Sequence, residues 1–358
     1  MFEYLMFENE QQAYEFQNTV ENNTLYDNLH LDIVENKLCA ISKHFPAKYF
    51  KKMNHDRDVA TYRGNIFREL GTTDAIKQTE NIFARTLLWE NMYEQVRNIA
   101  HPLQRKIIYV LVLSSYFDLI DIIVDFLSKF SSDGIKKMHD IFAGYLEDAT
   151  VSSARSIADE ARYKLAEHLH LSLSVDFREK RIMLSSSFCE ISTNLKDLDS
   201  LCSELTGIKV SDDIFITHNE AFTTLENVAL AFVLEKNKQL NECVDRVPQI
   251  SFILDEILLM NQQLAFYYAY HKLIQQLSEK GIPFCFPTFE KRPMIKCEEL
   301  YDISLSITKI EDTDFVQTGN AIALENEFQG FVLTGANQGG KTTYLRSVGL
   351  MIYLSMMG

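Results

Sequence analysis

Apolar side chains recur with a helical period along most of the chain, from about residue 74 to residue 281. Their spacings of seven, four, three and four residues within 80–100 predict one helix face, made of Ile82, Trp89, Tyr93, Val96 and Ala100. The 358 residues include only 13 Gly and 6 Pro, the two residue types that interrupt helices. Long helices are therefore expected over this part of the chain.

Two stretches show a narrower pattern, in which apolar residues alternate at spacings of three and four. The first, within 177–206, comprises Phe188, Ile191, Leu195, Leu198, Cys202 and Leu205. The second comprises Ile257, Met260, Leu264, Tyr267, His271 and Ile274. Narrow seams of this kind are typical of coiled-coil helices. We predict two long helices that pair antiparallel as an extended arm.

The second of these helices has a clear predicted end. Gly281 can adopt the left-handed conformation that follows a helix, and Pro283 cannot continue one. His271 lies on the apolar seam, where we interpret it as a core histidine with a hydrogen-bonded ring nitrogen and not as a metal ligand.

The pattern changes after Pro283, where four short runs predict strands: MIKCEEL (294–300), ISLSI (303–307), NAIALE (320–325) and GFVLT (330–334). We predict a domain boundary near 283–288. A mainly α-helical domain would span residues 1–283, and residues 284–358 would begin an α/β domain.

The most apolar stretch, 106–127, carries Asp118, Asp121 and Asp125 at helical spacing. A membrane span would place three carboxylates in lipid, so a helix against a protein core is expected. We interpret the aspartates as a solvated helix face in preference to a metal site. The acidic N-terminus lacks the basic start of a signal peptide.

Charge and cysteine content limit the partners and the compartment. The formal net charge of −15 argues against nucleic-acid binding by the whole surface. Two basic stretches, 43–57 and 177–181, could meet phosphates, although solvated faces are the preferred interpretation. The cysteines form no CxxC pair, which favours a reducing cytoplasm over a disulfide or zinc framework. They are Cys39, Cys189, Cys202, Cys243, Cys285 and Cys297.

Residues 335–342, GANQGGKT, match the phosphate-binding motif GxxxxGK[ST] in full. The preceding GFVLT predicts a buried strand, and the following TTYLRSVGLMIYLSMM (342–357) predicts a helix. Strand, glycine-rich turn and helix are the context that the motif requires. A nucleotide site is therefore expected here.

The residue types fit that chemistry. Gly339 and Gly340 lack a Cβ, so their backbone N–H groups can approach phosphate oxygens. The following helix adds the positive end of its dipole. Lys341 can neutralise the β- and γ-phosphates, and the Thr342 hydroxyl suits Mg²⁺.

The segment TGANQGGKTTYLRSVGL (334–350) resembles the MutS family of DNA mismatch-repair ATPases, whose loop reads approximately TGPNMGGKSTYLRQ. The fitting positions are Thr334, Gly335, Asn337, Gly339, Gly340, Lys341, Thr343, Tyr344, Leu345 and Arg346. Ala336 and Gln338 replace the usual Pro and Met, as in a divergent branch. The resemblance implies a site for ATP and Mg²⁺, with Thr342 as the metal ligand. Its nucleotide-binding residues would be Gly335, Asn337, Gly339, Gly340, Lys341, Thr342 and Thr343.

Weaker similarity extends upstream. GNAIAL (319–324) is similar to the family's Asn-containing strand ahead of the loop. Residues 263–287 are similar to the helix that returns from the family's long helical arm, called the lever, to the ATPase domain, and residues 56–70 are similar to the opening of the family's helical core. The chain departs from the family's pattern in three respects. The aromatic residue that stacks on adenine is replaced by Gln317, with Phe315 the nearest ring, and LYDISL (300–305) stands about where the family has a His-Pro pair. No mismatch-reading domain or Phe-x-Glu wedge is recognisable.

The resemblance implies a helical core and lever, 1–283, followed by the N-terminal part of a P-loop ATPase domain, 284–358. The expected protein is a cytoplasmic, DNA-binding homodimer that couples ATP hydrolysis to DNA engagement, without mismatch recognition of its own. The family's acidic strand and water-activating residues would follow residue 358, so we expect a piece of a longer protein that is inactive alone. We also expect the apolar helix after the loop to be poorly ordered or self-associated.

Two other functions fit the sequence less well. The chain could be a non-enzymatic interaction or scaffold module with a vestigial ATPase half, which its acidic balance favours and its intact Lys341 and Thr342 disfavour. An unrelated P-loop kinase or GTPase is disfavoured by TTYLR and by the long preceding helices.

Overall fold

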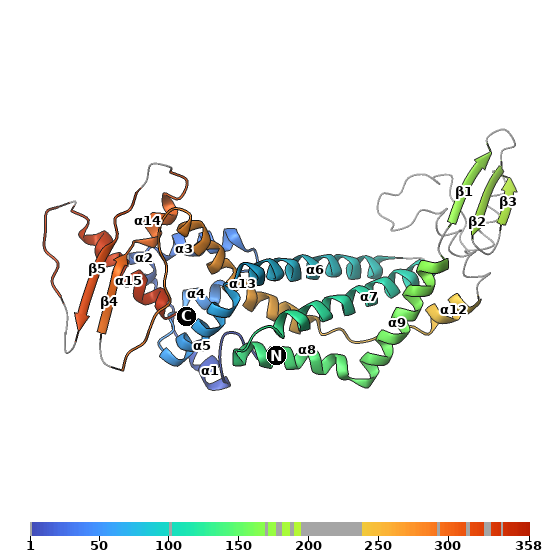
Figure 1. Cartoon of the computed structure of the whole chain (residues 1–358), viewed down its shortest axis with the longest axis horizontal. Coiled ribbons are helices and arrows are strands. Elements are labelled where there is room, and N and C mark those ends of the chain that lie inside the picture. Colours follow the sequence, from blue (N-terminus) through green and yellow to red (C-terminus); the bar gives the residue numbers. More distant parts are fainter. Residues whose placement is uncertain are drawn as a thin grey trace. The chain divides into compact units, whose positions relative to one another are not determined.

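The computed structural model describes residues 2–99, 102–168, 171–176, 181–186, 190–194, 238–291, 294–312, 316–325, 331–337 and 339–358, and most of them are helical (Figure 1). The helices before the first sheet are α1 Glu10–Gln17, α2 Asn23–Asn28, α3 Leu31–Ile41, α4 Ala47–Lys51, α5 Arg57–Leu70, α6 Thr73–Asn98, α7 Pro102–Leu127, α8 Asp133–Glu147 and α9 Ala149–His168. The later elements are β1 Leu171–Asp176, β2 Arg181–Ser186, β3 Glu190–Asn194, α12 Lys238–Asp245, α13 Leu254–Ser278, β4 Met294–Leu300, α14 Ile303–Thr308, β5 Asn320–Glu325 and α15 Lys341–Ser355. The mainly α prediction is confirmed.

The chain forms two compact units. The first contains residues 1–81, 125–141 and 253–358, and the second contains 82–124 and 142–252. The chain passes between the units at 81–82, 124–125, 141–142 and 252–253, none of which coincides with the predicted boundary near 283–288. Secondary structure does change there, because α13 ends at Ser278 and β4 begins at Met294.

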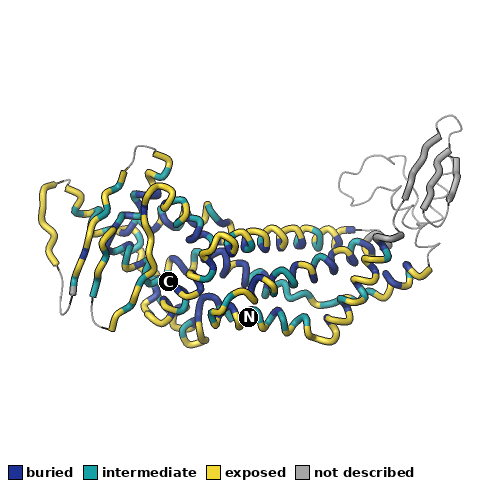
Figure 2. The backbone as a smooth tube through the Cα atoms, viewed as in Figure 1, coloured by how far each residue is buried: buried dark blue, intermediate teal, exposed yellow. Residues whose placement is uncertain are grey.

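The core of the first unit is an aromatic cluster centred on α13. The Phe266 ring has no exposed surface and lies 5.9 Å from Phe45 and 5.7 Å from Phe67, measured between ring centroids. The residues of the predicted seam are buried from Ile257 to His271. Residues on other faces of α13, such as Phe266 and Tyr270, are buried as well, so the buried surface is wider than the stripe of a coiled coil (Figure 2). The helix is therefore surrounded by its own unit and is not half of an extended arm.

The end of α13 follows the prediction. Gly281 has φ +81°, in the left-handed region that favours glycine. His271 is 7 % exposed, and its ring hydrogen-bonds to the Phe67 backbone, which matches the predicted core histidine. Its Nε2 is buried without a partner among the described residues.

The second unit is built on α6, α7, α9 and α12. Trp89 of α6 is fully buried and donates its Nε1–H to the Val112 carbonyl oxygen at 3.1 Å. Nearer the start of α7, Ile107 and Val110 pack with side chains of α9 and α12 in a single apolar cluster. The predicted face of α6 is thus a core face, except that Ala100 lies outside the described residues.

By length and composition, residues 105–127 of α7 could cross a membrane, but 61 % of the most apolar window is buried inside the protein. Its aspartates lie in ion pairs: Asp121 with Arg155, and Asp118 with Arg162 at 3.0 Å. Both features are those of a core helix with a polar outer face, consistent with a soluble protein.

The predicted helix over 177–206 is wrong where the structure describes it. Strands β2 and β3 occupy 181–186 and 190–194, and β1, β2 and β3 form an antiparallel sheet. Residue 173 pairs with 184, and 175 pairs with 182. LSLSVD (171–176) alternates apolar and polar residues, the period of a strand, and serine disfavours helix interiors. The alternating pattern thus predicts the observed strands better than the helical spacing of three and four residues does. Of the six residues with that helical spacing, only Ile191 lies among the described residues.

Two of the four predicted C-terminal strands are confirmed, because β4 and β5 pair antiparallel with an irregularity between Cys297 and Leu300. The run ISLSI is instead helix α14. Asp302 explains the error, since its side chain accepts a hydrogen bond from Leu305 N at 3.2 Å and caps a helix at this point.

Helix α15 lies beside β4 and β5 (Figure 1), where Val348 packs on Leu300 and Ile322. Its other face meets the N-terminal helices: the Tyr353 hydroxyl donates to the Phe50 carbonyl oxygen. Of the two expectations for the C-terminal segment, poor order is therefore wrong, because the segment is a regular helix packed on two sides. The prediction overlooked the N-terminal helices as a second surface. Self-association through this segment stays a prediction.

Candidate functional site

The phosphate loop ends at Gly340, the residue that opens α15. Gly340 has φ +77°, a conformation that costs other residues energy, and Tyr344 N donates to its carbonyl oxygen at 2.9 Å. One residue earlier, Gly339 N donates to Ala336 O at 3.2 Å, and a Cβ on Gly339 would lie only 3.0 Å from that oxygen. Both positions therefore favour glycine, Gly340 through its backbone conformation and Gly339 through its close approach to the Ala336 carbonyl oxygen.

Among the residues that the structure describes, no side chain caps the N-terminus of α15. The first N–H groups of a helix have no partner within it, and together with the helix dipole they favour an anion. The described loop residues, 331–337, 339 and 340, are all exposed. A phosphate could therefore reach these donors without displacing packed side chains.

Lys341 lies across the loop. Its Nζ donates to the Gly335 carbonyl oxygen at 2.8 Å and also to the Ala336 carbonyl oxygen. This geometry keeps the ammonium group next to the turn, at the same end of α15 as the free N–H groups. Positive charge and backbone donors thus converge at one place.

Thr342 is exposed and Thr343 is half-buried in the first turn of α15. Asn337 is exposed in the turn of the loop. Among the described residues no group of three or more His, Cys, Asp or Glu side chains could hold a metal ion. The Thr342 hydroxyl fits Mg²⁺ only as one ligand among phosphate oxygens and water, which is how Mg²⁺ is usually bound.

The predicted buried strand before the loop is not formed. Residues 331–336 have no regular structure, and the Val332 side chain is 90 % exposed. A central strand of a parallel sheet pairs with a neighbouring strand at each edge, and helices cover both of its faces. No described strand pairs with this segment, because the C-terminal sheet consists of β4 and β5 alone.

A buried polar network lies behind the loop. Arg346 Nη1 is 3.1 Å from Asp302 Oδ2, and the Asp302 side chain has no exposed surface. Gln317, the position where the resembled family has its adenine-stacking ring, donates through Nε2 to Asp302 O at 3.3 Å. Its amide is therefore engaged with the protein, while Phe315 lies outside the described residues. Asp302 is not among the residues predicted from the sequence, although an Asp before ISLSIT is a helix-capping signal.

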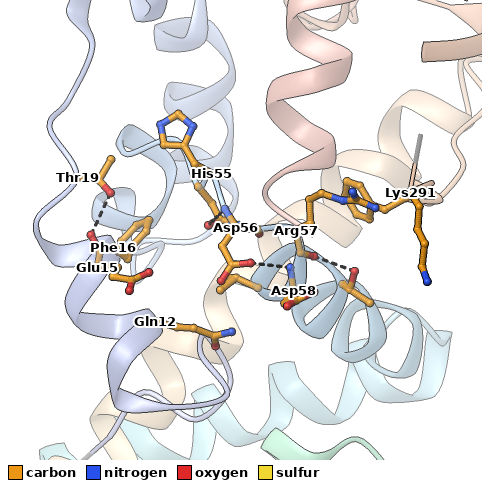
Figure 3. Close-up of a pocket in the computed structure, with 13 residues that line it drawn as sticks. Gln12, Glu15, Phe16, Thr19, His55, Asp56, Arg57, Asp58 and Lys291 are labelled. Atoms are coloured by element: carbon orange, nitrogen blue, oxygen red, sulfur yellow. Dashed lines mark hydrogen bonds between the residues drawn. The ribbon is translucent and has the colours of Figure 1, made fainter. Parts of the chain in front are cut away.

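A separate cleft of about 820 Å³ lies in the same unit, between α1, the start of α5 and residues 289–291 (Figure 3). Its charged lining is mixed: Glu15, Asp56 and Asp58 are acidic, and Arg57 and Lys291 are basic. Asp56 is used as the cap of α5, accepting from Asp58 N at 2.8 Å. None of the lining residues belongs to 335–343, so this cleft is not part of the loop site.

The basic stretch 43–57 is largely engaged in local contacts. Lys48 pairs with Glu3 at 2.6 Å, Lys51 pairs with Glu35 at 3.4 Å, and Lys52 donates to a main-chain oxygen. Neighbouring carboxylates weaken its attraction for phosphates. Of the second stretch, 177–180 lies outside the described residues.

Comparison with known proteins adds no assignment: no protein-family model matches the chain, and no curated protein matches it. The site is therefore interpreted from its own geometry.

Proposed function

We propose that this protein is a MutS-related ATPase that holds ATP and Mg²⁺ on the loop 335–342. One observation carries the proposal: Gly340, in a left-handed conformation, opens an uncapped helix of 15 residues, and Lys341 lies across the turn. Backbone donors, a helix dipole and a cation meeting at an exposed glycine-rich turn suit a polyphosphate.

The loop residues have separate roles in this proposal. The N–H groups of Gly340 and Lys341 bind phosphate oxygens, and the N–H of Gly339 joins them by leaving the Ala336 carbonyl oxygen. The Lys341 ammonium moves from the loop carbonyls to the β- and γ-phosphates. Thr342 contributes its hydroxyl to Mg²⁺, and Asn337 and Thr343 line the turn. The side chain that activates water for hydrolysis is not among these residues.

The resemblance in the loop also supports engagement of DNA by a cytoplasmic homodimer. The net charge of −15 restricts any DNA contact to local surfaces. Because no mismatch-reading wedge is recognisable, we expect equal affinity for mismatched and perfect duplexes. A competition binding assay checks this, and a tenfold preference, about 1.4 kcal/mol, would contradict it.

A second candidate is a non-enzymatic interaction module with a vestigial ATPase half. The exposed and unpaired segment 331–336 favours it, since a working P-loop normally follows a buried strand. In this case the loop would bind no nucleotide, although the rest of the chain would fold as before.

Calorimetric titration of Mg·ATP into the parent chain and two variants separates the candidates. Lys341→Ala removes the loop cation, and the matched control Lys309→Ala removes an exposed lysine from the end of α14. We expect binding by the parent and the control, and at least about tenfold weaker binding by Lys341→Ala. The free energy of unfolding should change by less than about 0.5 kcal/mol in both variants. Equal affinity in parent and Lys341→Ala would contradict the ATPase assignment, and absence of binding by the folded parent would favour the second candidate.

A further inference from the structure

The ion pair between Arg346 and Asp302 is unusual in its burial. The Asp302 side chain has no exposed surface and that of Arg346 is 17 % exposed. Removing two charges from water is costly, so a buried pair is weak support for stability and a candidate for a specific structural role. The Arg346 Nε is also buried and has no hydrogen-bond partner among the described residues.

Asp302 joins three segments of the first unit. Its Oδ2 accepts from Arg346 of α15, and its Oδ1 accepts from Leu305 N and from Ser304 Oγ at the start of α14. Its main-chain oxygen accepts from Gln317 Nε2. One buried aspartate therefore fixes the orientation of α15, the first turn of α14 and residue 317 together.

The other end of this connection is the phosphate loop. Arg346 follows Lys341 by five residues on the same helix, so the backbone of α15 connects the first turn to the guanidinium that contacts Asp302. Helix α14 in turn packs against α3 in the N-terminal part of the unit. The contacts form a continuous path from the loop through Arg346 and Asp302 to α14 and α3.

We propose that Arg346 and Asp302 are a positioning pair that transmits occupancy of the phosphate loop to α14. The inference rests on the proposed function, because it requires a nucleotide at 335–342. When phosphates bind the N–H groups of α15, the first turn of this helix is held against the ligand. The Arg346–Asp302 pair then tightens the cap of α14, whose backbone opens less often.

Hydrogen–deuterium exchange with and without Mg·ADP tests this in the full chain. In the parent we expect slower exchange both in the loop, 339–343, and in α14, 303–308, the latter by at least about threefold. Arg346→Gln should keep the loop protection and lose the α14 protection, and Arg346→Lys should recover part of it. Leu345→Ala, a neighbouring residue that is 48 % exposed, is the matched control and should behave as the parent.

Each outcome bears on a different claim. If α14 is protected equally in the parent and in Arg346→Gln, the positioning role is wrong and the nucleotide site stands. If the parent shows no protection in the loop, the proposed function and the inference fail together. Should Arg346→Gln fail to fold, Asp302→Asn replaces it, since Asn keeps the helix-capping oxygen without the charge, and the same loss of α14 protection is expected.

Discussion

The aromatic core around α13 and the phosphate loop before α15 belong to the same compact unit and are built in opposite ways. Phe266 has no exposed surface and lies among five aromatic rings. The loop is exposed throughout its described length and is held by hydrogen bonds to its own carbonyl oxygens. Substitutions in the core should thus change the free energy of unfolding, and substitutions in the loop should change the affinity for nucleotide. Few substitutions should change both.

The largest effect is expected in the core. Phe266→Ala removes the ring that contacts Phe45, Phe67 and Tyr270, and it leaves a cavity. The expected loss is about 3–5 kcal/mol in the free energy of unfolding. Chemical denaturation measures this loss, and Mg·ATP titration of the folded fraction should show unchanged affinity. A large change in affinity would show that core and loop are not separable.

The next effect depends on pH. Burial lowers the pKa of His271 from 6.5 to about 4, although the hydrogen bond with the Phe67 backbone opposes the shift. The unfolded chain therefore takes up a proton at a higher pH than the folded chain does. This contribution to stability is complete above pH 6.5 and is lost as pH falls towards 4, by about 3 kcal/mol in total.

The matched variant is His271→Gln, which keeps an N–H donor near Phe67 and does not titrate. Denaturation at pH 7, 5.5 and 4 should show a shallower pH dependence in the variant than in the parent. Parallel curves for the two proteins would mean that other groups cause the loss of stability in acid.

A smaller loss of stability is expected at the C-terminal end of α15. This end is packed in the core, although the first turn of the helix is partly exposed. Tyr353 is 2 % exposed, and its hydroxyl donates to the Phe50 carbonyl oxygen. Tyr353→Phe removes the donor, keeps the ring, and should cost about 1 kcal/mol in unfolding. A variant as stable as the parent would show that ring packing alone holds α15 to α4.

Periodicity in the sequence predicted the elements that have a strong pattern of apolar residues of their own. The α13 seam, its glycine stop at Gly281 and the strands β4 and β5 all appear where expected. The loop glycines were also predictable, because only glycine adopts the conformation of residue 340 at low cost. These features depend on local chemistry more than on distant neighbours.

The errors have more than one cause. The local alternation in LSLSVD favours the strands at 171–176, 181–186 and 190–194, against a helical spacing further along. The 331–334 run is apolar, but no described strand pairs with it. The buried contact of Arg346 with Asp302 joins residues 44 positions apart, which no periodicity contains.

The most direct measurement follows the backbone amide resonances of Gly339, Gly340 and Lys341 in an isotope-labelled chain during titration with Mg·ATP. If the loop binds phosphates, these resonances move with ATP in a saturable way, and sodium triphosphate moves the same set. Amides around Phe266 serve as the internal control and should stay in place. Loop resonances that do not move at saturating ATP would contradict nucleotide binding at the start of α15.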